Sequence, residues 1–166
     1  MTFKELLIKL NACEEAREWA GDMPIEEIVS TCRRGDWLLW LAEKVDVDLR
    51  LRTLAKGHCA NTVRHLMTDE RSIKAVDVAI AFGEGKATRE ELDAAAYAAY
   101  AAAAAAAAAA YAAYAAVAAA ADAAYAAAAA YAAYDAVAAN RQQTVDIFRE
   151  YIGEALIEKV NQLLTK

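Results

Sequence analysis

The chain has little of what interrupts helices or builds a catalytic site. Its 166 residues include one proline, six glycines and two histidines. No segment alternates apolar and polar residues with a period of two, so β-strands are not expected. No GxSxG elbow, glycine-rich phosphate loop or HExxH motif occurs, and no nucleophile–base pair is recognisable. General acid–base chemistry has little to draw on, so we expect a protein that is not an enzyme and uses no cofactor.

Positive charge is also in short supply. The chain has 18 lysines and arginines against 24 acidic residues, a net charge of −6. Extended nucleic acid is therefore not an expected partner, because binding it needs clustered positive charge. Three cysteines, Cys13, Cys32 and Cys59, form an odd set without CxxC spacing, which indicates free thiols in a reducing compartment. With no secretion signal at the N-terminus, we expect a cytoplasmic location.

Two features that suggest a metal site or a membrane span have simpler explanations. His58, Cys59 and His65 lie near one another, but their spacing matches no common ligand signature, so no metal site is expected. An alanine-rich block is long enough to span a bilayer. However, alanine is only weakly apolar and the block contains Asp122 and Asp135, so no membrane contact is expected.

Apolar residues recur at three- and four-residue steps, which predicts an all-α, single-domain bundle of about seven to eight helices. The helix-start signals are the capping boxes Thr2–Glu5 and Thr88–Glu91, a cap at Thr68 or Asp69, and Pro24 in a first turn. We expect helices over about 2–19, 24–34, 37–45, 48–67 and 69–82, one from 88 into the alanine block, and one after Asn140. Gly35 and Asp36 are expected to break the chain, whereas Gly57 weakens a helix without ending it.

The alanine-rich block is the most unusual part of the chain. From Ala94 to Ala139, 35 of 46 residues are alanine. As one helix the block would be roughly 70 Å long, so we expect a reversal within residues 115–130, with Asp122 its most polar place. A second reversal within the run of ten alanines stays open. These alanine/tyrosine-rich segments are expected to form the central helices.

Tyrosines and arginines are the candidate binding residues. Seven tyrosines interrupt the alanine block: Tyr97, Tyr100, Tyr111, Tyr114, Tyr125, Tyr131 and Tyr134. They act either as spacers with hydroxyls at the surface or as the lining of a groove for a flat, polar ligand such as a nucleobase. Ice binding is disfavoured because the block has no threonine. The arginine candidates are Arg33, Arg34, Arg50 and Arg52, whose guanidinium forks suit carboxylate or phosphate. The alternative for these arginines is pairing with the abundant glutamates on helix surfaces.

One stretch resembles a known family. "GDWLLWLAEK", followed by "DERSIKAVDVAIAFGEGKATREELDAAAYAAYAAA", is similar to the alanine-rich immunity proteins of bacteria and their phages. There, a tryptophan-bearing helix precedes an R-x-x-x-A helix that ends at a glycine, and alanine pairs with aromatic residues follow. The matching features are Trp37, Trp40, Arg71 with Ala75, Gly83, Gly85 and the alanine block.

The resemblance covers about residues 35–139 and divides the chain into three parts. N-terminal helices occupy 1–34, the immunity-protein-like region 35–139, and a C-terminal amphipathic helix 140–166. It implies an all-helical bundle that inhibits a toxin by binding or, in phages, blocks a host defence. It carries over no set of functional residues.

The expected function is therefore a cytoplasmic, non-enzymatic binding protein that neutralises a target, most simply a protein, by sequestration. The alternative is a sponge for a nucleotide-type signalling molecule, with tyrosines stacked on bases and arginines holding phosphates. A second alternative is a structural helical module, and a homodimer fits all three. A sponge should enclose a pocket with converging tyrosine hydroxyls and at least two arginines, whereas a protein inhibitor should offer a broad exposed patch.

Overall fold

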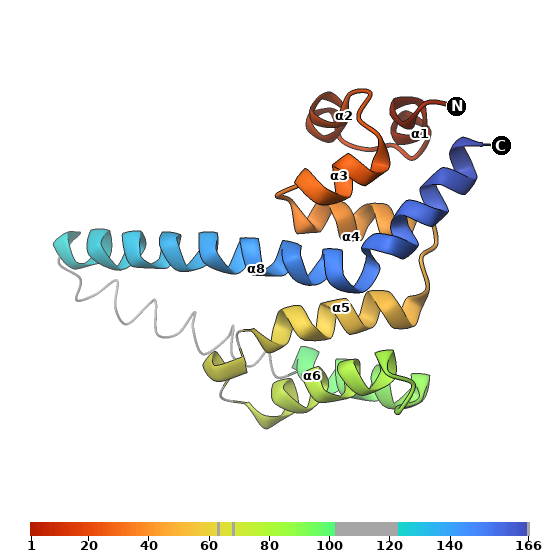
Figure 1. The fold of residues 1–166 in the computed structure, drawn as a ribbon. Coiled ribbons are helices and arrows are strands. Elements are labelled where there is room, and N and C mark those ends of the chain that lie inside the picture. Colours follow the sequence, from red (N-terminus) through yellow and green to blue (C-terminus); the bar gives the residue numbers. More distant parts are fainter. Residues whose placement is uncertain (63, 68, 102–122, 166) are drawn as a thin grey trace.

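Helices account for the regular structure of the computed structural model, in agreement with the predicted all-α class (Figure 1). The structure describes residues 1–62, 64–67, 69–101 and 123–165, with the side chains of 66 and 123–141 left out of the description. The elements are α1 (Phe3–Lys9), α2 (Glu14–Ala20), α3 (Ile25–Thr31), α4 (Gly35–Lys44), α5 (Leu49–Asn61), the 3₁₀ turn η1 (Arg64–Leu66), α6 (Glu70–Gly83), a helix over 89–101, and α8 (Ala123–Leu164). Within these ranges no residue is assigned to a strand.

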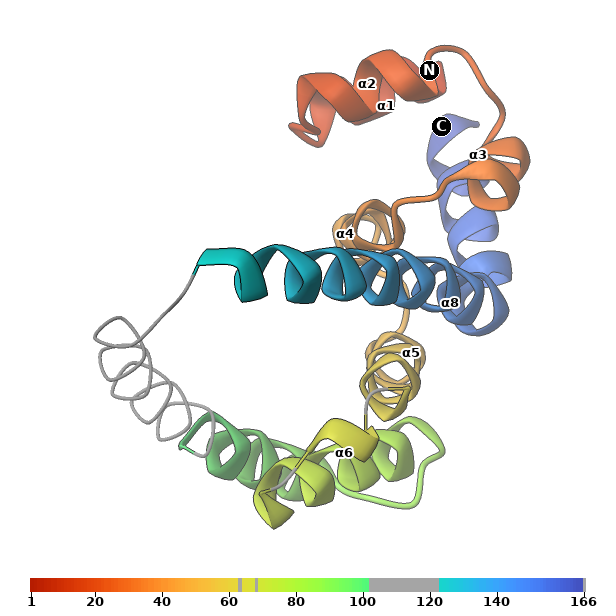
Figure 2. The ribbon, with the colours of Figure 1, turned by 90° about the vertical axis from the view of Figure 1, so that its left-hand side faces the viewer.

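The long helix α8 organises the other helices. Figures 1 and 2 show α3 and α4 along one side of its C-terminal half and α5 along another side. Helix α6 packs on the far side of α5, α1 lies near the C-terminal end of α8, and α2 packs beside α1. The two ends of the chain meet, since the Met1 ammonium donates to the carbonyl oxygen of Leu164 at 3.3 Å.

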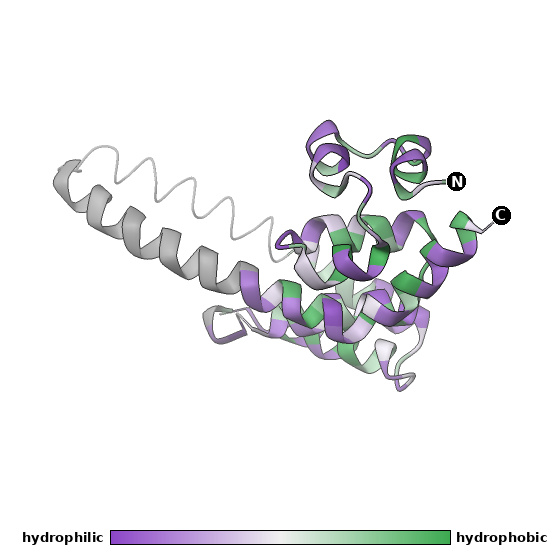
Figure 3. Cartoon of the chain, turned by 45° about the horizontal axis from the view of Figure 1, so that its top comes forward, coloured by the Kyte–Doolittle hydropathy of each residue, from purple (hydrophilic) through white to green (hydrophobic). Residues whose placement is uncertain are grey.

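The core follows one apolar stripe of α8. At steps of three and four residues the stripe carries Val145, Phe148, Ile152, Leu156 and Val160, each at most 4% exposed. These side chains pack with the buried residues of α3 and α4, and Figure 3 shows hydrophobic positions gathered on these helices where they meet.

Two glycines allow helices to approach closely. Gly35 opens α4 against α8, where an added Cβ would lie 2.8 Å from Cδ2 of Phe148. Gly83 ends α6 against α5, where an added Cβ would lie 2.8 Å from Cα of Leu54. The expected break at Gly35 was therefore wrong in detail: this glycine is the first residue of α4, and an added Cβ there would force the Phe148 ring to shift.

Local capping signals are confirmed. The Thr2 hydroxyl accepts from the Glu5 N–H while the Glu5 carboxylate accepts from the Thr2 N–H. Thr88 and Glu91 make the same reciprocal pair at 2.8 and 3.2 Å. Pro24, expected in a first turn, lies one residue earlier as the N-cap of α3 and makes no side-chain cap hydrogen bond. Asp69 caps α6 by accepting from the Arg71 N–H, and the three hydrogen-bonded caps are thus confirmed. These signals succeed because donor and acceptor lie within one turn of each other.

Three predicted helices are shorter than expected, and the one expected over 24–34 ends at Thr31. The helix expected over 2–19 is split into α1 and α2, because Asn11 adopts a left-handed φ of 58°. Asparagine tolerates this conformation better than other side-chain-bearing residues. The helix expected over 48–67 ends at Asn61, where the Thr62 hydroxyl donates to the Cys59 carbonyl at 2.7 Å, and His65 lies in η1 instead. Gly57 remains inside α5, as expected.

The C-terminal helix is longer than expected. Helix α8 runs unbroken for 42 residues, so it does not begin after Asn140. Asparagine costs only a few tenths of a kcal/mol in a helix, and the alanines around it are the best helix formers. The part of the predicted reversal in 123–130 is therefore wrong, since that stretch is helical. The remainder of that prediction, 115–122 with Asp122, and the run of ten alanines from 102 onward lie outside the described residues.

Among the helices that the structure describes, none combines the length and the apolar character needed to cross a membrane.

Candidate functional site

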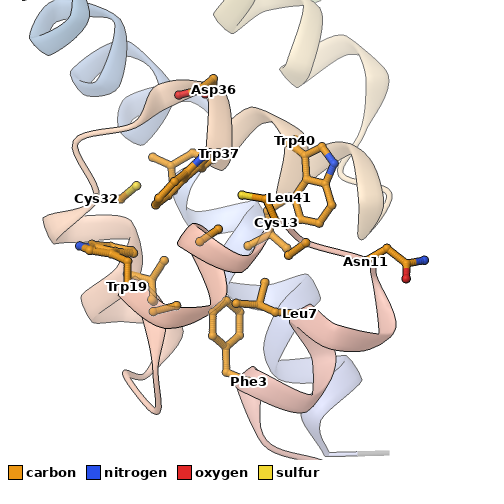
Figure 4. A pocket seen from close by; sticks show the side chains of 15 residues that line it. Phe3, Leu7, Asn11, Cys13, Trp19, Cys32, Asp36, Trp37, Trp40 and Leu41 are labelled. Atoms are coloured by element: carbon orange, nitrogen blue, oxygen red, sulfur yellow. The ribbon is translucent and has the colours of Figure 1, made fainter.

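Aromatic side chains line a cleft in the N-terminal half of the chain, which we call the tryptophan cleft. It has a volume of about 480 Å³ and is bounded by α1, α2, α4 and the C-terminal end of α3. All three tryptophans of the chain, Trp19, Trp37 and Trp40, line it. Figure 4 shows Trp19 and Trp37 next to each other near Cys32, with Trp40 farther along the cleft.

Helix α2 forms one wall and is joined to α4 by two contacts. The indoles of Trp19 and Trp37 lie 5.9 Å apart between ring centroids, tilted by 56°. One turn earlier on α2, Glu15 forms an ion pair with Arg34 at 3.7 Å. The Arg34 guanidinium also lies 4.7 Å from the centre of the Trp37 ring, a cation–π arrangement. Within α2, Ala20 is the buried residue, so these contacts hold this wall in place.

The charges at the edge of the cleft neutralise one another. Arg34 donates to both carboxylate oxygens of Asp36, at 2.9 and 2.7 Å. These hydrogen bonds lower the pKa of Asp36 and raise that of Arg34. Asp36 is the one charged residue among those that line the cleft in the described structure. The interior of the cleft is therefore apolar and carries no uncompensated charge.

Two thiols lie at the cleft in different environments. Cys13 is exposed, whereas Cys32 is 1% exposed. Burial raises the pKa of Cys32, and its sulfur donates to the Arg34 carbonyl at 3.4 Å. Cys32 is consequently a small apolar core residue, and Cys13 is the accessible thiol of the pair.

A second, polar hollow adjoins the cleft through Asp36. It has a volume of about 400 Å³ and is lined by Arg33, Arg34, Gly35, Asp36 and Thr144. Because Arg34 is paired with Asp36, Arg33 is the cation in this hollow that remains available to bind an anion. Arg33 is exposed and makes no hydrogen bond or ion pair with the residues that the structure describes.

The predicted tyrosine site is only partly within the described structure. Tyr97 and Tyr100 lie on the helix over 89–101 and are 78% and 76% exposed. Their exposure fits hydroxyls at the surface, and neither residue lines either hollow. Tyr111 and Tyr114 lie outside the described residues. Only the backbone of α8 is described at Tyr125, Tyr131 and Tyr134.

Two of the four arginines predicted to form a binding site lie together in the structure. Arg33 and Arg34 share the polar hollow. Arg50 instead donates to the Phe82 carbonyl and stacks on the Phe82 ring at 4.5 Å, which joins α5 to the end of α6. Arg52 is half-buried, and its Nε has no hydrogen-bond partner among the described atoms. The expected pairing of arginines with glutamates gives way to pairing mainly with aspartates, as Arg64 with Asp77 shows.

His58 and Cys59, two of the residues considered as metal ligands, each contact α8. His58 stacks on Tyr151, with ring centroids 4.5 Å apart and planes 8° from parallel. Cys59 donates to the Thr144 carbonyl at 3.8 Å, and burial raises the pKa of its thiol to about 11. In the part of the chain that the structure describes, no three metal-ligating side chains are grouped around one point.

Reasoning from the sequence missed the tryptophan cleft. The available signal was that all three tryptophans fall between residues 19 and 40. That signal is weak, since the pattern of apolar residues along a helix does not show whether a partner helix covers them.

Comparison of the chain with models of protein families, with curated proteins and with solved structures found no match. The resemblance to alanine-rich immunity proteins therefore rests on the motifs in the sequence.

Proposed function

We propose that the chain is a non-enzymatic binding protein that neutralises a protein target by sequestration, and that the tryptophan cleft receives an apolar anchor of that target. The observation that carries this proposal is the convergence of Trp19, Trp37 and Trp40 on one apolar hollow. Binding energy at protein interfaces concentrates in a few buried positions rich in tryptophan, tyrosine and arginine, within a rim that excludes water. The network of Glu15, Arg34 and Asp36 is such a polar rim.

The biological setting of the proposal comes from the sequence resemblance. An immunity or phage anti-defence factor acts inside the cell by occupying its target, which agrees with the free thiols and the proposed cytoplasmic location. A homodimer is compatible with this role, and exposed Tyr97 and Tyr100 lie on a surface available for self-association.

A capture experiment with matched variants tests this function. Tagged wild-type protein is used to isolate a partner from the source cells, and the purified partner is then titrated against variants. Replacing Trp19 and Trp40 together by alanine should weaken binding by about 100-fold or more, as expected for two anchor residues. The control, Tyr97→Ala with Tyr100→Ala, should bind within about threefold of wild type. The reverse pattern would place the interface on the tyrosine surface and refute the cleft as the anchor site.

The nucleotide sponge is the second candidate, and the polar hollow with Arg33 and Arg34 is the observation in its favour. It ranks lower because Arg34 is already held by Asp36, and no tyrosine of the described residues lines that hollow. Native mass spectrometry of the purified protein, with a thermal-shift screen of cyclic and linear nucleotides, separates the candidates. A retained nucleotide mass or a saturable rise in Tm would favour the sponge.

A further inference from the structure

The tryptophan cleft has the dimensions of a small-molecule site. Its volume of about 480 Å³ falls within the range of roughly 300–1,000 Å³ that ligand pockets occupy. Such pockets are lined mainly by apolar and aromatic side chains with a few polar groups at defined points. Here Phe3, Leu7 and Leu41 add apolar surface to the three indoles, and Figure 4 shows Asn11 and Asp36 at the edges.

The charges of the cleft select against a charged ligand. Asp36 already accepts two hydrogen bonds from Arg34, so neither residue offers an unmatched charge to the cleft. An ionised group placed among Trp37, Leu41 and Phe3 would lose its hydration without gaining a counter-charge. An uncharged group pays no such penalty, and a flat one can stack offset or edge-to-face on the indoles.

From this complementarity we infer that the tryptophan cleft binds small uncharged aromatic molecules. A bound molecule of this kind would occupy the place of the apolar anchor of a protein target. This exclusion of the anchor rests on the proposed function. The protein is then a binding protein whose anchor site is controlled by a small ligand.

The distribution of tryptophan makes the test specific. Because all three tryptophans of the chain line the cleft, every fluorine resonance of protein labelled with fluorotryptophan reports on it. The labelled protein is titrated with naphthol, a neutral bicyclic aromatic, and in parallel with naphthalenesulfonate, its anionic counterpart. We expect saturable shifts with naphthol at a Kd below about 1 mM, and binding of the sulfonate at least about tenfold weaker.

Two matched variants locate the ligand. Ala16 lines the cleft, so Ala16→Phe fills it, whereas Ala96→Phe adds the same ring on the exposed face of the helix over 89–101. Naphthol should lose saturable binding to the first variant and keep it with the second. Both must keep the dispersed fluorine resonances of the folded protein; if Ala16→Phe unfolds, Cys13→Phe fills the cleft from an exposed position before α2 instead.

The outcomes separate this inference from the proposed function. Absence of saturable shifts, equal binding of the sulfonate, or binding that persists in the filled cleft would overturn the inference. Resonances that move with protein concentration alone would show a second copy in the cleft and overturn it as well. If naphthol binds but leaves the affinity for the captured target unchanged, only the exclusion of the anchor fails. If no target is captured, the proposed function fails while the fluorine titration still decides the ligand site.

Discussion

The guanidinium of Arg149 donates to the carbonyl oxygen of Cys32 at 2.8 Å, a hydrogen bond that joins the long helix α8 to a residue of the tryptophan cleft. The same group donates from Nε to the carbonyl oxygen of Val29 at 2.8 Å. Val29 is in the last turn of α3 and Cys32 is its C-cap residue, where carbonyl groups lack hydrogen-bond partners within the helix. One side chain of α8 thus completes the end of α3 and positions the cleft beside it.

Removing this contact should destabilise the protein. In Arg149→Met the carbonyls of Val29 and Cys32 lose their charged donor in a partly buried place, and we expect a loss of about 2–3 kcal/mol in the free energy of unfolding. Urea denaturation measures it. The matched control is Arg89→Met, which removes an ion pair with Asp93 whose side chains are 57% and 59% exposed, and should cost less than about 1 kcal/mol. Equal losses for the two variants would contradict the capping role of Arg149.

Truncation of Trp19 should have a moderate effect on stability and a larger one on the cleft. Trp19 is 38% exposed, and its ring contact with Trp37 is worth about 0.5–1.5 kcal/mol beyond its burial. We expect Trp19→Ala to lower the free energy of unfolding by about 1–2 kcal/mol and to shift the fluorescence of the remaining tryptophans as water enters. Ile8→Ala, at a side chain 50% exposed, should change stability by less than about 0.5 kcal/mol. An unchanged emission spectrum would show that Trp19 is not a wall of the cleft.

Two glycine-to-alanine substitutions should have opposite consequences. At Gly83 the new Cβ would lie 2.8 Å from the Leu54 Cα and 3.0 Å from the Arg50 carbonyl oxygen, backbone that cannot yield locally. Gly83→Ala should therefore cost about 1–3 kcal/mol. At Gly153, inside α8, the nearest atom would be the Val29 Cγ1 at 3.3 Å. Since alanine is favoured over glycine by up to about 1 kcal/mol in a helix, Gly153→Ala should be neutral or stabilising. Thermal unfolding of the two variants and of wild type compares their Tm values. A Gly83→Ala variant more stable than wild type would contradict the close packing of α5 on α6.

The cap of α6 should weaken in acid. Hydrogen bonds from the Arg71 side chain and backbone lower the pKa of Asp69 from 3.8 to about 2. Because the folded value lies below the unfolded one, the stabilisation is present above 3.8 and is lost as the pH falls toward 2. The difference in urea midpoint between wild type and Asp69→Asn, which does not titrate, should therefore shrink over this interval. The effect should be small and reduced by salt, since the group is exposed. A constant difference would contradict the titration of this carboxyl group.

The three thiols should react at very different rates. Cys13 is exposed, Cys32 is buried and Cys59 is partly buried. Burial raises the pKa of Cys32 and raises that of Cys59 to about 11, so both of these thiols are poor in thiolate. We expect a disulfide reagent at mildly alkaline pH to modify one thiol rapidly in folded protein and all three in urea. Mass spectrometry counts the modifications, and Cys13→Ser should remove the rapid one. A rapid reaction with two or more thiols in folded protein would contradict the protection of Cys32 and Cys59.

The outcome of sequence-based prediction depended on the range of the interactions involved. The boxes Thr2–Glu5 and Thr88–Glu91 and the cap at Asp69 were predictable, because each is a contact within one helical turn. The break at Asn11 and the continuity through Asn140 were not. Asparagine is tolerated in both a left-handed turn and an alanine-rich helix, and its neighbours in the fold decide between them.

The candidate site shows the same limit. The arginine pair at Arg33 and Arg34 was found because the residues are adjacent, but the partner that occupies Arg34 is known only from the geometry around Asp36. The cleft formed by the three tryptophans was not predicted, because the apolar pattern of a helix carries no sign of which face stays uncovered.

The sequence by itself determined the helical class, most helix starts, the acidic balance and the free state of the thiols, since these follow from composition and from contacts a few residues apart. The tertiary structure decided which apolar faces are covered. Phe148, Ile152 and Leu156 of α8 are buried in the core with α3 and α4, whereas α1 and α2 leave a hollow against Trp37 and Trp40. That choice depends on how closely helices distant in sequence can pack, which Gly35 and Arg149 control through contacts that no local pattern contains.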